Sequence, residues 1–215
     1  MRKMTVKLPN KNELRTRETR DLLLRAAETI FARDGYEGAE LGEIALLAGR
    51  TKGAIYGHFK SKEDLFMALF IERMSGHMNR MLELLAESTS IEQNLRIFRE
   101  FYVGTLEDKS WSLLLLEFKL FAMRHPESME RFRKVHRLLL PQAYQDEEQS
   151  KFFGSVEDGK TAVSRSAAVA ALGPILSALT VEAVFEPGLL DEHTLRKIVT
   201  RVFDALMPPP SRESL

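Results

Sequence analysis

Cysteine is absent from the 215 residues of this chain. Without thiols there can be no disulfide framework and no cysteine-built metal site, and the absence fits a reducing cytoplasm. An apolar leader is missing as well, because the first residues, MRKMTVKLPNKNELRTR, are charged where a secretory signal needs an apolar core. We therefore expect a cytoplasmic protein that is not exported.

Strand signals are also lacking. No run of alternating apolar and polar residues is bounded by an Asn-Gly or Asp-Gly turn, and every long segment instead repeats its apolar residues at helical spacing. We predict an all-α fold of about nine helices. A three-helix N-terminal domain is expected to precede a larger helical domain.

The motifs of common enzymes are missing. The chain has no G-x-S-x-G, no H-E-x-x-H, no P-loop and no glycine-rich dinucleotide turn. The five histidines are scattered singly, and His125 and His136 have no spacing that suits a metal. We expect a protein that is not an enzyme and that uses no cofactor and no metal, and we keep a helical enzyme as a remote alternative.

The net charge of zero hides an asymmetry. Residues 1–60 contain 12 Lys and Arg against 8 Asp and Glu, a balance of +4, so the rest of the chain carries −4. Local charge, and not the total, sets the attraction to a phosphate backbone. A basic N-terminal module is therefore joined to a mildly acidic larger one.

Apolar periodicity and capping signals place the helices. A basic, Pro-containing arm precedes them, a loop is expected at residues 147–160, and a Pro-rich tail closes the chain. The predicted helices span residues 16–34, 41–47, 52–59, 62–86, 91–107, 110–124, 127–146, 161–185 and 191–206.

One stretch, GRTKGAIYGHFK at residues 49–60, combines three glycines, three cations, a tyrosine and a histidine. It follows a short helix and a turn, Ala48-Gly49-Arg50-Thr51, in which the glycine permits a sharp reversal. This is the pattern of a helix-turn-helix, whose second helix enters a DNA major groove about 12 Å wide. Ile55 and Phe59 are expected to anchor that helix to the core.

The other residues of the stretch have roles that suit DNA. Small residues permit close approach to bases, the helix N-terminus and the cations can hold phosphates, and the tyrosine and histidine can donate hydrogen bonds. His58 could instead be a packed histidine, and the lysines could be solvated. The residues predicted to contact DNA are Arg17, Arg50, Thr51, Lys52, Gly53, Ala54, Tyr56, His58 and Lys60.

The segment FARDGYEGAELGEIALLAGRTKGAIYGHFKSKEDLF resembles the N-terminal domain of the TetR family of transcriptional regulators, above all its multidrug-efflux repressor branch. The resemblance covers residues 17–77. It implies a homodimer whose larger domain binds a small molecule and thereby releases DNA. It also implies the division of the chain into an arm (1–15), a DNA-binding domain (16–60), an effector-binding and dimerisation domain (61–208) and a tail (209–215).

Two positions depart from the family pattern. Where the family usually caps its second helix with Thr or Ser, this chain has Ala39-Glu40, which gives up a cap worth about 1 kcal/mol. Arg50 stands in the turn where a small apolar residue is usual. It either contacts a phosphate or is simply solvated.

Aromatic and methionine side chains are frequent between residues 65 and 125. They could line an effector cavity, or they could be plain core. Glu117 lies on an apolar helical stripe, where it reaches solvent, pairs within the chain or meets a donor from an effector. The residues predicted to line the pocket are Phe66, Phe70, Met74, Met78, Phe98, Phe101, Tyr102, Trp111, Leu114, Glu117, Phe118 and Phe121.

The segment SRSAAVAALGPILSALTVEAVF is nearly uncharged but is interrupted by Ser, Thr and Gly, and we expect a buried interface in preference to a membrane span. Gly173-Pro174 should kink its helix. Together with the last helix it would form a four-helix bundle about a two-fold axis. The predicted interface residues are Val169, Leu172, Ile175, Leu176, Leu179, Leu195, Ile198, Val202 and Phe203.

The sequence thus favours a dimeric, ligand-responsive regulator, most simply a repressor, that binds a pseudo-palindromic operator and is released by a small lipophilic effector. Its expected partners are double-stranded DNA, the effector and a second copy of the chain, with no membrane. The main alternative is a DNA-binding regulator of the same fold that has no small-molecule effector or that answers to a protein partner.

Overall fold

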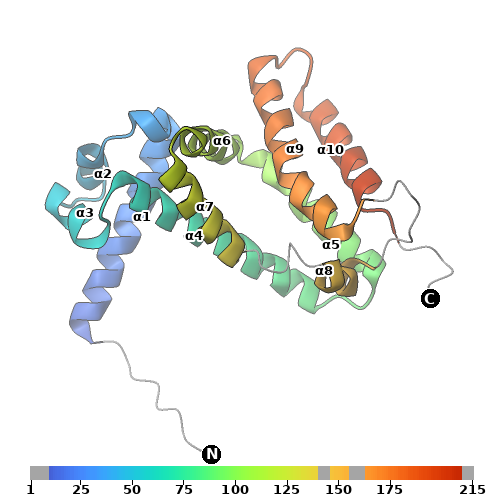
Figure 1. Ribbon diagram of the computed structural model, residues 1–215, viewed down its shortest axis with the longest axis horizontal. Helices are drawn as coiled ribbons and strands as arrows, with labels where there is room; N and C mark the ends of the chain where they lie inside the picture. Colours follow the sequence, from blue (N-terminus) through green and yellow to red (C-terminus); the bar gives the residue numbers. More distant parts are fainter. Residues whose placement is uncertain (1–9, 140–145, 155–162, 210–215) are drawn as a thin grey trace, which may run out of the picture. The chain divides into compact units, whose positions relative to one another are not determined.

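The computed structural model describes residues 10–139, 146–154 and 163–209, and within these ranges it confirms an all-α fold, with ten α-helices, one 3-10 turn and no strand (Figure 1). Parts of the predicted arm, of the 127–146 helix, of the 147–160 loop and of the tail lie outside the described residues. The elements are α1 (Lys11–Gly38), α2 (Leu41–Leu47), α3 (Lys52–His58), α4 (Lys62–Ala86), α5 (Ile91–Gly104), the 3-10 turn η1 (Thr105–Glu107), α6 (Lys109–Arg124), α7 (Pro126–Leu139), α8 (Asp146–Phe153), α9 (Arg165–Phe185) and α10 (Glu192–Leu206).

The chain divides into two compact units, Met1–Glu72 and Arg73–Leu215. The first unit holds α1, α2, α3 and the start of α4. It reaches beyond the boundary expected at residue 60, because the first turns of α4 supply part of its core. Within that core, the ring of Phe66 packs edge-on against Phe31 at 5.6 Å and against Tyr36 at 5.4 Å between centroids.

The first helix begins at Lys11, so the prediction of a flexible arm through residue 15 is wrong. The reason is a capping box: the Asn10 side chain accepts hydrogen bonds from the backbone amides of Asn12 and Glu13, both at 3.0 Å, and the Glu13 carboxylate accepts the Asn10 amide at 2.9 Å. Helical φ and ψ angles are interrupted at Gly35, whose φ of 73° only glycine adopts easily. That glycine ends the long part of α1, as expected.

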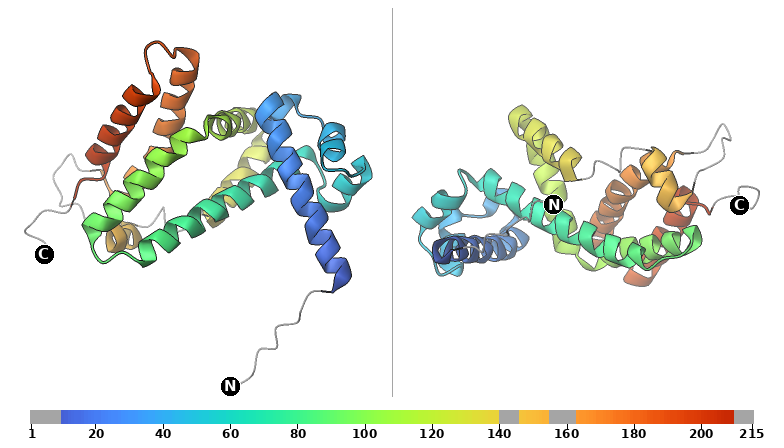
Figure 2. Two further views of the ribbon diagram at one scale, coloured as in Figure 1. Left: turned by 180° about the vertical axis from the view of Figure 1, so that it is seen from behind. Right: turned by 90° about the horizontal axis from the view of Figure 1, so that it is seen from below.

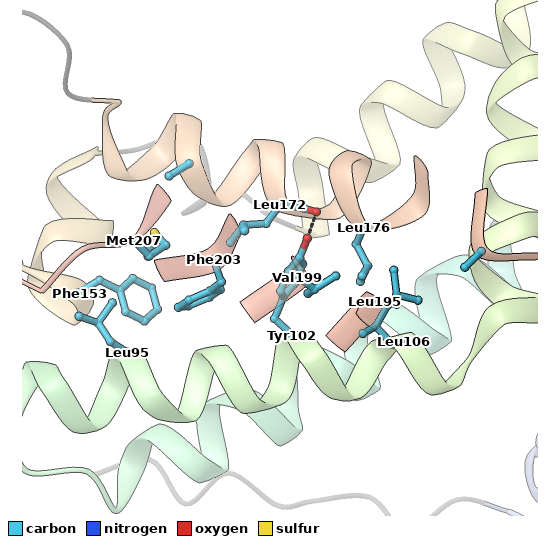
Figure 3. Close-up of a cluster of buried hydrophobic side chains, with 12 residues drawn as sticks. Leu95, Tyr102, Leu106, Phe153, Leu172, Leu176, Leu195, Val199, Phe203 and Met207 are labelled. Carbon is cyan, nitrogen blue, oxygen red and sulfur yellow. Dashed lines mark hydrogen bonds between the residues drawn. The ribbon is translucent and has the colours of Figure 1, made fainter. Parts of the chain in front are cut away.

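The second unit has its own core, built from α5, α8, α9 and α10 (Figure 3). Phe203 packs edge-on against Phe98 at 5.4 Å, and the Tyr102 hydroxyl donates to the carbonyl of Leu172. Burial raises the pKa of Tyr102, so the hydroxyl stays a donor. Helices α9 and α10 lie side by side in both ribbon views (Figure 2).

This core corrects part of the predicted dimer interface. Leu172, Leu176, Leu195 and Phe203 are each at most 5% exposed within a single chain, so they cannot form the surface that meets a second copy. They pack α9 onto α10 and α5 instead. The remaining predicted interface residues, which keep part of their surface, are Val169, Ile175, Leu179, Ile198 and Val202.

Two further elements differ from the expectations. Residues 147–153, which lie in the predicted loop at 147–160, belong to α8, whose Phe153 stacks on Phe98 at 4.9 Å. Helix α9 has the length and apolar composition of a membrane-spanning helix, although the sequence was expected to fall short. Its buried side chains belong to the core described above, and core helices share those properties with membrane spans.

Candidate nucleic-acid interface

The turn between α2 and α3 is a Schellman motif. The amide of Arg50 donates to the carbonyl of Ala45 at 2.8 Å and that of Gly49 to Leu46 at 3.0 Å, with Gly49 at a φ of 63°. Thr51 then caps α3 by accepting the Ala54 amide at 3.3 Å. The predicted helix-turn-helix is therefore present, with both short helices where the sequence placed them.

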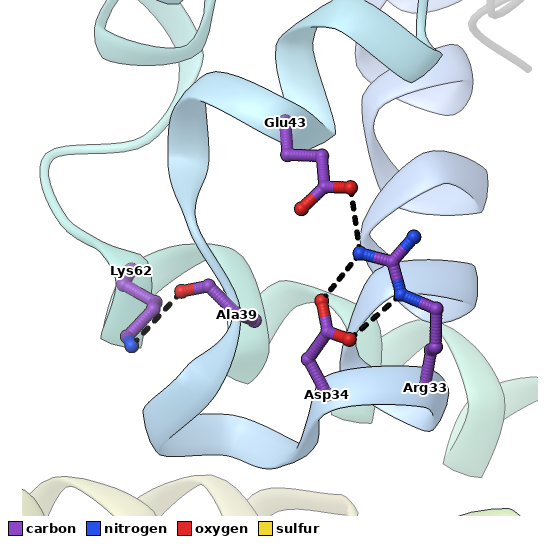
Figure 4. A network of polar contacts seen from close by, with 5 residues as sticks. All are labelled: Arg33, Asp34, Ala39, Glu43 and Lys62. Carbon is purple, nitrogen blue, oxygen red and sulfur yellow. Dashed lines mark hydrogen bonds and ion pairs between the residues drawn. The ribbon is translucent and has the colours of Figure 1, made fainter.

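Polar contacts around the first turn of α2 hold the start of this helix in place (Figure 4). The Arg33 guanidinium bridges the carboxylates of Asp34 and Glu43, each at 2.6 Å, and so joins the end of α1 to α2. The hydrogen bond from Arg33 lowers the pKa of Asp34. Lys62 donates to the carbonyl of Ala39 at 3.1 Å. Exposed pairs of this kind contribute little stability, so their effect is mainly to orient α2.

The start of α2 shows the departure noted in the sequence. Glu40 occupies the N-cap position, and its side chain makes no capping hydrogen bond. Glu43, one turn on, complements the helix dipole. The helix thus depends on its buried residues, Ile44 and Ala45, for its place in the fold.

Helix α3 has one buried and one exposed side. Ile55 and Phe59 are 0% and 4% exposed, which confirms that they anchor the helix. The opposite side carries Lys52, Gly53, Tyr56, Gly57 and Lys60, all exposed. Lys52, Gly53, Tyr56 and Gly57 recur at i, i+1, i+4 and i+5, so they share one face of α3, and Lys60 follows shortly after the end of the helix. We call these five residues the recognition face.

The fold does not depend on the residues of the recognition face. Tyr56 is 54% exposed, and within the described residues neither Lys52 nor the Lys60 ammonium forms an ion pair. A Cβ added to Gly57 would meet nothing within 4 Å, and one added to Gly53 would meet only the Thr51 hydroxyl at 3.7 Å. Glycine inside a helix costs about 1 kcal/mol relative to alanine, and the fold does not require it at these two positions. Gly57 was not among the predicted contacts, although its i+4 spacing from Gly53 places it on the same face of α3.

The other predicted contacts flank this face. Arg17 is exposed on α1, and Ala54 and His58 are half-buried beside the recognition face. The Arg50 guanidinium donates to the carbonyl of Gly49 at 3.1 Å and approaches the Thr19 hydroxyl at 3.5 Å, while the residue stays exposed. The first unit therefore gathers all nine predicted DNA contacts.

The predicted pocket residues, in contrast, are not gathered at one place. Phe66 and Phe70 are at most 1% exposed in the core of the first unit, so they do not line an effector cavity. Trp111 lies under the Arg73 guanidinium at 4.5 Å, and Phe101 packs edge-on against His77. Of the others, Phe98 and Tyr102 belong to the α5–α8–α9–α10 core, Leu114 and Phe118 are buried on α6, and Met74, Met78, Glu117 and Phe121 are half-buried.

Neither of two surface pockets coincides with that predicted set. One, of about 430 Å³, lies at the start of α5 and is lined by residues 88–92 with Asn94 and Lys151. The other lies along the first turns of α1, and its lining includes Arg17. Among the residues that the structure describes, no group of three or more His, Asp or Glu could hold a metal ion.

Comparisons with known proteins agree with this geometry. The family described as "Bacterial regulatory proteins, tetR family" matches residues 23–69. The HTH-type transcriptional regulator AcrR of Shigella flexneri is 36% identical over 100 residues, which is 46% of this chain and 46% of AcrR. The aligned part thus spans less than half of that relative.

Solved structures extend the likeness of the fold to most of the chain. The fatty acid degradation regulator FadR of Bacillus halodurans has a TM-score of 0.67 at 22% identity, covering 94% of this chain and 97% of that one. FadR of Bacillus subtilis, solved in complex with stearoyl-CoA, has a TM-score of 0.63 at 21% identity, covering 89% and 99%. Residues 23–69, which include the helix-turn-helix, thus match the DNA-binding domain of the TetR family of transcriptional regulators, and this N-terminal domain resembles those of multidrug-efflux repressors.

Proposed function

We propose that this protein is a ligand-responsive repressor that binds a pseudo-palindromic operator as a homodimer and leaves it when a small lipophilic effector binds. The observation that carries the DNA-binding part is the recognition face, whose cations and glycines have no role within the chain. Two copies related by a two-fold axis would read half-sites about 34 to 36 Å apart.

The DNA contacts would divide by chemistry. Lys52, Lys60 and Arg50 would meet phosphates, because ammonium and guanidinium groups supply most of the nonspecific affinity. Tyr56 would donate a hydrogen bond to a phosphate or a base edge. Gly53 and Gly57 would let the backbone approach the groove floor, where a side chain would hold it away.

The second unit would supply dimerisation and effector binding. The half-buried residues Ile175, Ile198 and Val202, together with the exposed Val184 and Phe185, offer apolar surface on α9 and α10 for a second copy. Support for an effector comes from the FadR relative solved with stearoyl-CoA. An effector releases DNA only if it binds the DNA-incompetent state more tightly, and a coupling of about 1 to 3 kcal/mol is typical.

A footprint on the DNA upstream of the protein's own gene tests this function. We expect protection of two half-sites by the full chain, loss of protection on adding a lipophilic compound that binds, and a dimer by sedimentation. A monomer on a single half-site would refute the dimer, and protection that no bound compound removes would favour the alternative without a small-molecule effector.

A further inference from the structure

The α6–α7 hairpin has a charge opposite to that of the domain that contains it. Residues 109–139 hold seven Lys and Arg against three Glu, a balance of +4, while residues 61–215 as a whole carry −4. Arg133 and Arg137 on α7 form no ion pair within the described part of the chain. Local charge of this kind selects anions from solution.

Lys119 is the unusual member of this group. It lies half-buried in the apolar run from Leu113 to Met123, and the described residues provide no carboxylate for its ammonium group. Burial lowers the pKa of Lys119. Cations near the end of α7 are favoured by that helix's own dipole, but Lys119 sits in the middle of α6, where no dipole accounts for it.

His136 is the neighbour of Lys119 from the facing helix. Helices α6 and α7 pack together, and the His136 ring lies 6.4 Å from the ring of Phe132, which in turn packs on Phe118. Burial, and then the charge of Lys119, lower the pKa of His136. Because the charge of Lys119 opposes protonation of His136, an anion bound between the two side chains would favour the charged form of both.

Apolar side chains lie exposed beside this pair. Leu120 is 47% exposed and Met123 is 70% exposed, and with Lys119 they occupy positions i, i+1 and i+4 on one side of α6. A cation half-buried next to uncovered apolar surface is complementary to a molecule that has a charged head and an alkyl chain.

We propose that the α6–α7 hairpin binds a free single-chain anionic amphiphile, whose carboxylate or phosphate lies between Lys119 and His136 and whose alkyl chain covers Leu120 and Met123. This deepens the proposed function, because the amphiphile is then the effector. The charge complementarity selects the anionic head, and the small number of exposed apolar residues fits one chain in preference to a bilayer surface.

Titration calorimetry of the full chain with decyl amphiphiles, kept below their micelle concentrations, tests the site. Decanoate and decyl phosphate should bind, and decyltrimethylammonium should not. Lys119→Met should weaken decanoate binding at least tenfold, since it removes a charge-assisted hydrogen bond, and His136→Gln should weaken it about threefold. Lys134→Met, which removes the same charge from an exposed position on α7, should bind like the parent.

Several outcomes would overturn the site. Decanoate binding that is unchanged in Lys119→Met, or that falls equally in Lys134→Met, would show that no specific head-group site exists. Binding to phosphatidylglycerol vesicles without binding to free decanoate would assign the surface to a membrane. A melting curve for each variant separates these results from a failure to fold.

The titration contains no DNA, so the site and the proposed function can fail separately. Decanoate binding that depends on Lys119 but leaves the operator occupied would keep the site and refute the effector role. Operator release by decanoate that persists in Lys119→Met would keep the role and refute the site.

Discussion

The sequences of the two units differ in how clearly they indicate a function. In the first unit the residues of the recognition face lie exposed and are not needed for the core, so their composition suits an outside partner. In the second unit the aromatic residues that suit an effector are largely the same residues that fill the core, as Tyr102 and Phe118 show. A side chain indicates a ligand clearly only where the fold does not need that side chain for packing.

The largest effect is expected on stability, from a substitution that tests whether a residue of the second unit lies in the core or at an interface. Leu195 was predicted at the dimer interface but is 1% exposed in its own chain. Leu195→Ala should therefore lower the free energy of unfolding by about 2 to 5 kcal/mol, because it leaves a cavity. Thermal unfolding measures this, and Leu84→Ala, at a side chain that is 44% exposed, should cost far less. If Leu195→Ala dissociated a dimer without lowering the melting temperature, our assignment of Leu195 to the core would be wrong.

A smaller effect should appear in DNA binding by the first unit. Lys52→Ala should weaken operator binding about tenfold and reduce the slope of log affinity against log salt by about 1, because one phosphate contact is lost. Tyr56→Phe should weaken binding through the lost hydroxyl. Neither change should move the melting temperature, since both side chains are exposed.

Lys109→Ala is the matched control, because it removes an exposed lysine from the second unit. Gel retardation over a range of salt concentrations compares the three variants. If Lys52→Ala and Tyr56→Phe both retarded the operator as the parent does, the recognition face would be wrongly assigned.

Some features of the molecule could be predicted from the sequence and others could not. The bounds of α2 and α4 and the inward direction of Ile55 and Phe59 could be predicted, because capping residues and helical spacing act locally. What an apolar stripe packs against could not be predicted. Phe66 and Leu172 both lie on such stripes, and periodicity does not say whether a stripe meets a ligand, a second copy or the chain itself.

Local signals were also missed where composition suggested disorder. Asn10 and Glu13 form a capping box that extends α1 toward the N-terminus, yet they stand among charged residues after a proline. Helix α8 contains mostly polar residues, and it is held by Phe153, which stacks on Phe98 of α5, far away in the sequence. Contacts between residues so far apart in the sequence cannot be predicted from the spacing of apolar residues.

A third prediction separates stability from binding at one position. Gly57→Ala should raise the free energy of unfolding by about 1 kcal/mol, because alanine is the better helix former and its Cβ meets nothing within 4 Å. The same methyl group should weaken operator binding severalfold, since it stands on the recognition face. Gly76→Ala, on the exposed side of α4 and equally open, should stabilise the chain without changing DNA affinity. Equal DNA affinity of both variants would show that the backbone at Gly57 does not approach DNA.

The smallest effect concerns the missing cap of α2. Glu40 has the extended backbone of an N-cap, with φ −106° and ψ 130°, but makes no capping bond. Glu40→Ser should therefore stabilise the chain by about 0.5 to 1 kcal/mol, because a serine hydroxyl can accept an orphan amide of the first turn. Glu37→Ser removes the same charge from an exposed residue three positions earlier and should give no gain. If thermal unfolding showed the two variants to be equally stable, the gain would come from charge and not from capping, and the orienting contacts of Arg33 and Lys62 would be sufficient to hold the start of α2.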